Sequence, residues 1–226
     1  MDKIREINKS FGKLDVLVNV SIDFPHGKTT CILGPSGCGK TTLLNIISGL
    51  WAEDSGNIYG FQGDIAYVFQ EDRLIPWKNI EDNLRFVLRG KINKMEMDNI
   101  IDKYLKLVSL EEYKRYYPSQ LSGGMRQRIN ILRAFIYPSN LIIMDEPFKS
   151  LDINTKQVLI DFCKFLREIY EKTCIIVTHD IDEAILLGHR IVILTDKPTT
   201  VKKIIEIEEQ DNWIRLRTEI EREFTA

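Results

Sequence analysis

Gly34-Pro35-Ser36-Gly37-Cys38-Gly39-Lys40-Thr41 is the stretch that decides the fold, because it reads Gly-x-x-x-x-Gly-Lys-Thr between a strand-like and a helix-like segment. The run Thr30–Leu33 precedes it, and Thr42–Ile47 follows it. A loop between a strand and a helix N-terminus turns successive backbone N–H groups toward one point, where the helix dipole adds positive potential. Glycines let that backbone approach phosphates closely. A chance glycine-rich turn is the alternative, but it would not explain why strand, helix, Lys40 and Thr41 all stand in place.

The loop therefore predicts a bound nucleoside triphosphate, with Gly34 to Thr42 as its nucleotide-binding residues. Lys40 is expected to reach the β- and γ-phosphates, and the Thr41 hydroxyl to bind Mg²⁺. Cys38 lies inside the loop, so bulky thiol reagents would inhibit with ATP protecting, unless burial makes this thiol inert.

A second motif, Leu141-Ile142-Ile143-Met144-Asp145-Glu146-Pro147, has four apolar residues followed by two acids. The pattern predicts a central strand whose acids lie at its carboxyl end, where ligands of open α/β sheets bind. Asp145 is then expected to orient Mg²⁺ and complete the metal site begun by Thr41. Glu146 is expected to polarise the water that attacks the γ-phosphorus. Alone, such acids are equally typical of a solvated strand end.

Length and composition set the outer limits. A chain of 226 residues with 44% hydrophobic residues is expected to form one large domain. A net charge of −2 and a pI near 6.0 argue against nucleic acid as a partner. The first residues lack the apolar core of a signal peptide, and no apolar run approaches the roughly 18 residues of a membrane span. Four scattered cysteines predict reduced thiols, so we expect a soluble, intracellular chain.

Apolar runs typical of strands recur along the chain, and amphipathic helices such as Val158–Ile169 separate the later ones. The runs are Ile4–Asn8, Leu14–Val20, Cys31–Leu33, Ile58–Tyr59, Ile65–Phe69, Leu141–Met144, Cys174–Val177 and Ile191–Leu194. This alternation indicates an α/β core with a mostly parallel central sheet, preceded by an antiparallel β part. We expect one domain over 1–226, with its core at about 1–78 and 138–210, an inserted helical lobe at about 79–137, and a short charged helix at about 211–226.

Leu121-Ser122-Gly123-Gly124-Met125-Arg126-Gln127-Arg128 precedes a helical pattern and lies shortly before the acidic strand. Together with the phosphate loop, it closely resembles the signature segment of ABC-type ATPases, a group of P-loop NTPases, and the likeness extends from Phe11 to about Leu194. The resemblance implies that two copies pair head to tail around two ATP molecules. It also implies that the signature residues Ser122, Gly123 and Gly124 contact the nucleotide held by the other copy's loop.

The resemblance assigns further residues. It implies that Phe11 stacks on the adenine, although a core phenylalanine is the alternative. It also implies that Gln70 senses Mg²⁺ and the attacking water, that Ser150-Leu151-Asp152 crosses the dimer interface, and that His179 bonds to the γ-phosphate. His26 and His189 lack such spacing and are expected to be structural.

The segment from Val68 to Asn79, with its Pro76-Trp77 pair, resembles importer ATPases of the nitrate/sulfonate/taurine group. The resemblance implies integral membrane permease subunits as partners, an extracytoplasmic solute-binding protein as an indirect one, and a peripheral position on the cytoplasmic face of the membrane. Leu74, Ile75 and Trp77 are candidate apolar anchors for a permease helix, or else they pack inside the lobe. The transported solute is not readable from this chain.

Three positions depart from the importer pattern. Lys149 replaces a small residue beside the interface segment, and Leu132 and Phe135 replace smaller residues after the signature.

Three alternative functions stay open. A soluble ABC ATPase usually carries two cassettes or a long coiled coil. A kinase with the same loop would lack the signature and His179. A non-catalytic module is disfavoured because every hydrolytic position is filled.

Overall fold

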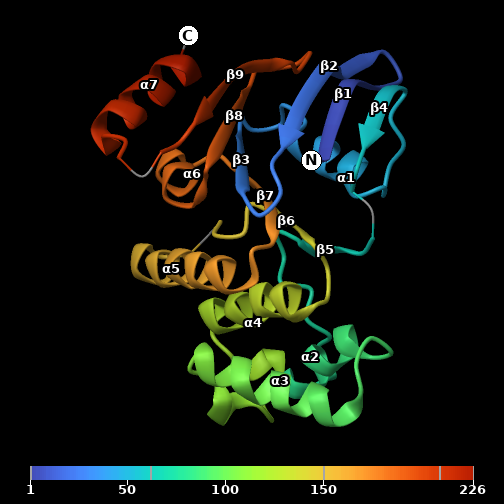
Figure 1. Ribbon diagram of the computed structural model, residues 1–226, viewed down its shortest axis with the longest axis vertical. Helices are drawn as coiled ribbons and strands as arrows, with labels where there is room; N and C mark the ends of the chain where they lie inside the picture. Colours follow the sequence, from blue (N-terminus) through green and yellow to red (C-terminus); the bar gives the residue numbers. More distant parts are fainter. Residues whose placement is uncertain (1, 62, 150, 209, 226) are drawn as a thin grey trace.

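The phosphate loop lies at the edge of the central sheet where its parallel strands have their carboxyl ends. The computed structural model describes residues 2–61, 63–149, 151–208 and 210–225, and Figure 1 shows this sheet in the upper part of the view. Its strand order is β5-β6-β7-β3-β8-β9, and β9 runs antiparallel to β8 whereas the other pairs are parallel. The strands are β3 (Thr29–Leu33), β5 (Ile65–Val68), β6 (Leu141–Asp145), β7 (Thr173–Thr178), β8 (Arg190–Leu194) and β9 (Val201–Glu206).

A second, antiparallel sheet stands beside the first, with the order β2-β1-β4. It consists of β1 (Asp2–Phe11), β2 (Leu14–Phe24) and β4 (Ser55–Tyr59). β1 and β2 form a hairpin whose turn includes Gly12 at φ +62°, a left-handed conformation that glycine adopts without strain. Phe11 therefore ends a strand at the tip of a hairpin.

Some of the helices cover the central sheet, and others form a separate group below it in Figure 1. They are α1 (Lys40–Ile47), α2 (Ile80–Leu88), α3 (Lys94–Leu107), α4 (Gly123–Ile136), α5 (Ile153–Tyr170), α6 (Ile181–Leu187) and α7 (Trp213–Thr225), with short 3₁₀ turns η1 (Glu111–Tyr113) and η2 (Pro118–Gln120). At the starts of six helices, a side-chain oxygen of the preceding residue accepts a hydrogen bond from a first-turn N–H group; these residues are Asn79, Asn93, Ser122, Asp152, Asp180 and Asn212. None of the helices in the described ranges combines the length and apolar character of a membrane span.

The core divides along the faces of the sheet. Ile32 of β3 faces a cluster shared with the antiparallel sheet and α1, whereas Cys31 and Leu33 face the cluster shared with α5, α6 and α7. This alternation is what a sheet covered on both faces requires. α4 belongs to two clusters, because Phe135 packs under the sheet and Leu132 packs with α2 and α3. The two large residues that depart from the importer pattern thus fill buried space.

The expected fold class is confirmed, and each apolar run named above lies in a strand. β9 was not predicted, because Val201-Lys202-Lys203 interrupts its apolar pattern, and lysines of this kind are typical of edge strands. α6 was also missed, since seven residues leave little periodicity to detect. The charged helix expected near the end of the chain is α7.

Candidate active site

Neighbouring parallel strands bring the predicted residues to one edge of the central sheet. β3 leads into the loop, β6 ends at Asp145, and β7 ends at Thr178, directly before His179. The register pairs Leu33 with Thr178 and Asp145 with Val177, so these strand ends are level. The carboxyl edge of an open α/β sheet is where ligands bind. Three motifs far apart in the sequence therefore meet at one place.

Close packing explains two of the loop glycines. A Cβ on Gly34 would lie 2.9 Å from Cys38 Sγ, and a Cβ on Gly39 would lie 2.8 Å from Val16 Cγ1. Gly39 also has φ +119° and precedes α1 without any side-chain cap. A helix that begins without a side-chain cap leaves its first N–H groups available to an anion.

A hollow of about 280 Å³ lies over the loop. It is lined by Phe11, Leu14, Val16, Gly37, Gly39, Lys40, Thr41, Thr42, Glu146 and Lys197. Ser36 and Gly37 are exposed at the tip of the loop, and Pro35 is half-buried. Five of the nine loop residues predicted to bind a nucleotide thus line this cavity, and Glu146 lines it from the end of β6.

Lys40 holds the loop to itself. Its side chain is buried, and Nζ donates hydrogen bonds to the carbonyl oxygens of Gly34, at 2.7 Å, and Pro35, at 2.8 Å. Burying an ammonium is costly unless it is hydrogen-bonded, and these two carbonyls satisfy part of its donor capacity. The remaining positive charge stays at the floor of the hollow.

Thr41 and Asp145 form a pair of oxygen donors. Thr41 Oγ1 donates to Asp145 Oδ2 at 2.8 Å. Burial raises the pKa of Asp145, and the hydrogen bond from Thr41 opposes that rise. Hydroxyl and carboxylate oxygens suit Mg²⁺, which binds one or two protein oxygens and completes its shell with phosphate and water. Within the described ranges no three His, Cys, Asp or Glu side chains form a metal cluster.

Glu146 follows directly and points to the same edge. Its φ is +46°, an uncommon conformation for a residue with a side chain, and its N–H donates to Val177 O at 2.9 Å. Carboxylate Oε2 lies 2.8 Å from Lys149 Nζ, an ion pair whose approach is not aligned as a hydrogen bond. Burial alone would raise the pKa of Glu146, but Lys149, His179 and Lys40 together hold that pKa below its usual range. The carboxylate is therefore charged at neutral pH.

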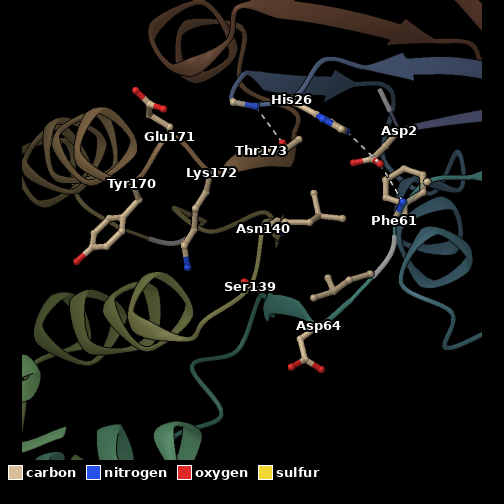
Figure 2. Close-up of a pocket in the computed structure, with 14 residues that line it drawn as sticks. Asp2, His26, Phe61, Asp64, Ser139, Asn140, Tyr170, Glu171, Lys172 and Thr173 are labelled. Atoms are coloured by element: carbon tan, nitrogen blue, oxygen red, sulfur yellow. Dashed lines mark hydrogen bonds and ion pairs between the residues drawn. The ribbon is translucent and has the colours of Figure 1, made fainter. Parts of the chain in front are cut away.

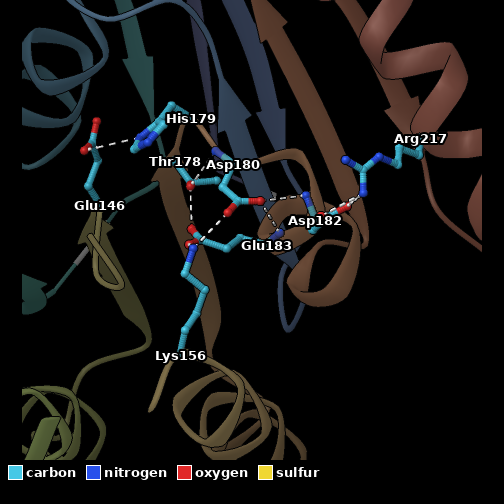
Figure 3. A network of polar contacts seen from close by, with 8 residues as sticks. All are labelled: Glu146, Lys156, Thr178, His179, Asp180, Asp182, Glu183 and Arg217. Carbon is cyan, nitrogen blue, oxygen red and sulfur yellow. Dashed lines mark hydrogen bonds and ion pairs between the residues drawn. The ribbon is translucent and has the colours of Figure 1, made fainter. Parts of the chain in front are cut away.

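His179 approaches the same carboxylate from β7. Its Nδ1 lies 3.5 Å from Glu146 Oε2, and its side chain is 51% exposed (Figure 3). Gln70 is exposed two residues after β5, whose Val68 pairs with Met144 of β6. Both residues thus belong to the edge that carries Asp145 and Glu146.

Phe11 is not a core residue. Its ring is 46% exposed and packs edge-to-face on Trp51, with 5.5 Å between ring centroids. Lys9 Nζ lies 5.6 Å from the same ring. The ring borders the hollow over the loop, which leaves a face for a planar group. Trp51 was missed in the sequence, where a lone tryptophan after the loop helix gives no signal.

The signature residues begin another helix and do not line this hollow. Ser122 caps α4, with Oγ accepting from Met125 N at 3.3 Å. A Cβ on Gly124 would lie only 2.6 Å from Thr155 Cγ2 in the first turn of α5. Asp152 caps α5, with Oδ1 accepting from Thr155 N at 3.0 Å. These residues form a second surface, whereas Ser150 lies outside the described residues.

The importer-like segment is divided between the interior and the surface. Leu74 is buried with the lobe cluster, so it is not an exposed anchor, whereas Trp77 is 77% exposed. Asn83 of α2 holds the backbone between them, accepting from Ile75 N at 2.7 Å and donating to Lys78 O at 3.0 Å. Trp77 therefore projects from a fixed turn.

A cavity of about 520 Å³ lies at the opposite edge of the sheet (Figure 2). Two pairs of the groups that line it contact each other: His26 Nε2 lies 3.3 Å from Asp2 Oδ1, and Gly27 N donates to Thr173 Oγ1 at 3.0 Å. His189, near this edge, accepts from Thr29 N at 3.0 Å, and burial lowers its pKa to about 4. His26 and His189 both lie away from the hollow over the phosphate loop.

All four cysteines are buried free thiols. Cys38 is 1% exposed, and burial raises its pKa. Of the two outcomes considered for this loop thiol, its burial supports the inert one, since the thiolate is the reactive form.

Comparison with known proteins places these features in one family. A model of the family described as "ABC transporter" matches residues 17–149. The aliphatic sulfonates import ATP-binding protein of Bacillus cereus is 39% identical over 215 residues, covering 90% of this chain and 84% of its own. The nitrate import ATP-binding protein of Synechococcus elongatus is 37% identical over 208 residues, covering 87% and 76%. A solved dimeric ATP-binding cassette, in a post-hydrolysis state with ADP and Pi, is 32% identical with a TM-score of 0.78, covering 92% of this chain and 99% of its own.

Proposed function

Since this chain belongs to the ABC transporter family, we propose that it is the ATP-hydrolysing subunit of a bacterial importer of the nitrate/sulfonate/taurine type. The observation that carries the proposal is the convergence of Lys40, Thr41, Asp145, Glu146 and His179 at one edge of the sheet. Phosphoryl transfer to water needs little more than positioning and charge neutralisation, and this set supplies both.

Each residue has a distinct task in the proposed hydrolysis. Lys40 and backbone N–H groups of the loop from Gly34 to Thr42, in which Pro35 alone has none, would bind the phosphates, and Phe11 would stack on the adenine. Thr41 and Asp145, with Gln70 beside them, would hold Mg²⁺, which when bound supplies positive charge to the transferring phosphoryl group. Glu146, charged at neutral pH, would accept a proton from the attacking water. His179 would bind the γ-phosphate and keep the Glu146 carboxylate turned toward the water.

A second copy of the chain is proposed to complete each site. Ser122 caps α4, whose first residues are Gly123 and Gly124, and Asp152 caps α5, whose Thr155 lies against Gly124; Ser122 and Gly123 are exposed. A helix N-terminus of this kind attracts a phosphate. The similar solved cassette is dimeric, which supports head-to-tail pairing with these residues facing the other copy's nucleotide.

Transport would come from partners. The two similar proteins named above are import ATP-binding proteins, which supports integral membrane permease subunits as partners and an extracytoplasmic binding protein as the selector of the solute. Trp77 would be an apolar anchor for a permease helix, because it is the most exposed large ring of the importer-like segment. The chain would then lie at the cytoplasmic face of the membrane. We propose no nucleic-acid partner.

One experiment separates this function from that of a soluble ABC ATPase. The tagged chain is expressed with the membrane-protein genes encoded next to it, extracted in mild detergent, and assayed for ATP hydrolysis with and without Mg²⁺. We expect an integral membrane protein to co-purify, and Trp77→Ser to weaken this association while Trp51→Ser does not. ATP hydrolysis by a chain that never associates with a membrane protein would favour the soluble alternative.

A further inference from the structure

We propose that Lys156 of α5 is a positioning residue for His179, holding the loop that carries the histidine through Asp180 and Glu183. The inference deepens the proposed function, because it rests on His179 acting at the γ-phosphate. Lys156 itself is half-buried beneath that loop and does not line the hollow over the phosphate loop.

Two carboxylates share the Lys156 ammonium. Nζ lies 2.8 Å from Asp180 Oδ2 and 2.7 Å from Glu183 Oε1, as Figure 3 shows. The other oxygen of Glu183 accepts a hydrogen bond from the Thr178 hydroxyl. Thr178 and Asp180 are the residues on either side of His179. The contacts of Lys156 and Glu183 therefore restrain the chain both before and after the histidine.

The contacts leave this loop few alternatives. Asp180 N donates to Thr178 Oγ1 at 3.1 Å, and Asp180 Oδ1 accepts from Asp182 N at 2.9 Å and from Glu183 N at 3.2 Å, capping α6. The Glu183 side chain is 6% exposed and carries a charge that burial penalises unless it is paired. Lys156 is the cation that pairs it within the described residues. Without that ammonium, the buried carboxylate loses its ion-pair partner, and we expect the loop to move.

The side chain of His179 has little packing of its own to fix its position. Its side chain is 51% exposed, and its ring Nδ1 lies 3.5 Å from Glu146 Oε2. The position of the imidazole therefore follows from the backbone between Thr178 and Asp180. A positioning residue must act on that backbone, and Lys156 does.

The same helix turn also meets the signature segment. Lys156 N donates to Asp152 O at 2.9 Å, and Thr155 packs against Gly124. Lys156 thus anchors the His179 loop to the turn that begins with the interface residue Asp152.

The decisive comparison uses Lys156→Met and Lys156→Arg, with Lys164→Met as the matched control. Lys164 lies two turns further along α5, and no ion pair ties it to the described residues. Because Lys156→Met leaves the Glu183 charge unpaired, a second variant combines it with Glu183→Gln and so removes both charges. Urea unfolding of each variant identifies any that is unfolded under assay conditions.

A direct readout follows the histidine ring. The chain has three histidines, so ring carbon resonances of histidine-labelled protein are few, and His179→Ala assigns one of them. We expect the His179 resonance to move in both Lys156 variants that lack a cation, to return in Lys156→Arg, and to stay unchanged in Lys164→Met. An unmoved His179 resonance in the folded variants would overturn the inference.

Kinetics then test the consequence. We expect kcat for ATP hydrolysis to fall at least about tenfold in Lys156→Met with KM for ATP nearly unchanged, since small misplacement of a reacting group costs up to about 10²-fold. In a His179→Ala background the same change should cost nothing further. An additional loss there would show that Lys156 acts elsewhere. Full turnover by His179→Ala alone would refute the proposed role of His179, while the resonance would still decide the positioning.

Discussion

Glu146→Gln tests the proposed hydrolysis most directly, because it removes a charge and keeps the shape. Glutamine has the same number of side-chain heavy atoms and the same tolerance of φ at +46° as glutamate, so the backbone after β6 keeps its path. The lost ion pair involves a Lys149 side chain that is 41% exposed. Such pairs contribute about 0–1 kcal/mol, and we expect the free energy of unfolding to fall by no more than that.

The effect on hydrolysis should be far larger. A positioned general base contributes roughly 10²–10⁴ in rate, which corresponds to about 2.7–5.4 kcal/mol of activation free energy. ATP affinity should stay nearly unchanged, because the loop donors and Lys40 are untouched. The variant should therefore bind ATP, barely hydrolyse it and accumulate as an ATP-bound dimer.

The assay measures phosphate release at saturating Mg-ATP, ATP affinity by calorimetry, oligomeric state by gel filtration with ATP, and stability in urea. Glu168→Gln, on the exposed side of α5, is the matched control. Turnover by Glu146→Gln within about tenfold of the unmodified protein would refute the assignment of Glu146, since a lost general base costs more. Loss of affinity or stability that matched the loss of rate would refute the reasoning from the structure.

Three further outcomes are expected. Lys40→Met should lower ATP affinity by at least about tenfold in calorimetry, since charge-assisted hydrogen bonds contribute about 1.5–3 kcal/mol each; unchanged affinity would contradict the loop assignment. Lys149→Ala should raise the pKa of Glu146, because burial then acts without the ammonium at 2.8 Å, and the acid limb of the pH–rate profile should move to higher pH, whereas Lys149→Arg should leave it in place. Burial alone would raise the pKa of Glu81, but a hydrogen-bonded cation and other nearby cations lower it. The stability that the charged Glu81 adds to the fold is therefore present above the ordinary glutamate pKa and is lost as the pH falls through the lowered pKa. Glu81→Gln should therefore cost about 3 kcal/mol at pH 7 and flatten the decline of urea stability in acid; an equally steep decline would contradict the linkage.

The sequence predicts best where one short segment contains its own physical reason. The loop from Gly34 to Thr41 and the strand ending in Asp145 each specify a local conformation, and parallel strands then align their ends. The positions of Lys40, Asp145 and His179 at one edge follow from that alignment. Predicting where these three residues lie thus takes only the local pattern of each segment and the parallel alignment of the strands.

Contacts between distant segments were not predictable in the same way. Trp51, which follows α1, reaches Phe11 at the hairpin tip, and Lys156 reaches Glu183 because the first turns of α5 and α6 lie side by side. Neither pair has a spacing that sets it apart from surface residues. Lys149 stood out as a departure from the importer pattern, but its ion pair with Glu146 depends on the left-handed backbone at Glu146.

The contact between Gly124 and Thr155 bears on how mutants of the signature are interpreted. Even one methyl group at position 124 would stand 2.6 Å from the Thr155 methyl, so the first turn of α5 would have to shift. Lys156 is the next residue and would shift with it, carrying the disturbance into the nucleotide site of the same subunit. An inactive Gly124→Ala protein would thus report an internal steric clash between α4 and α5, and not the loss of a contact with a second copy.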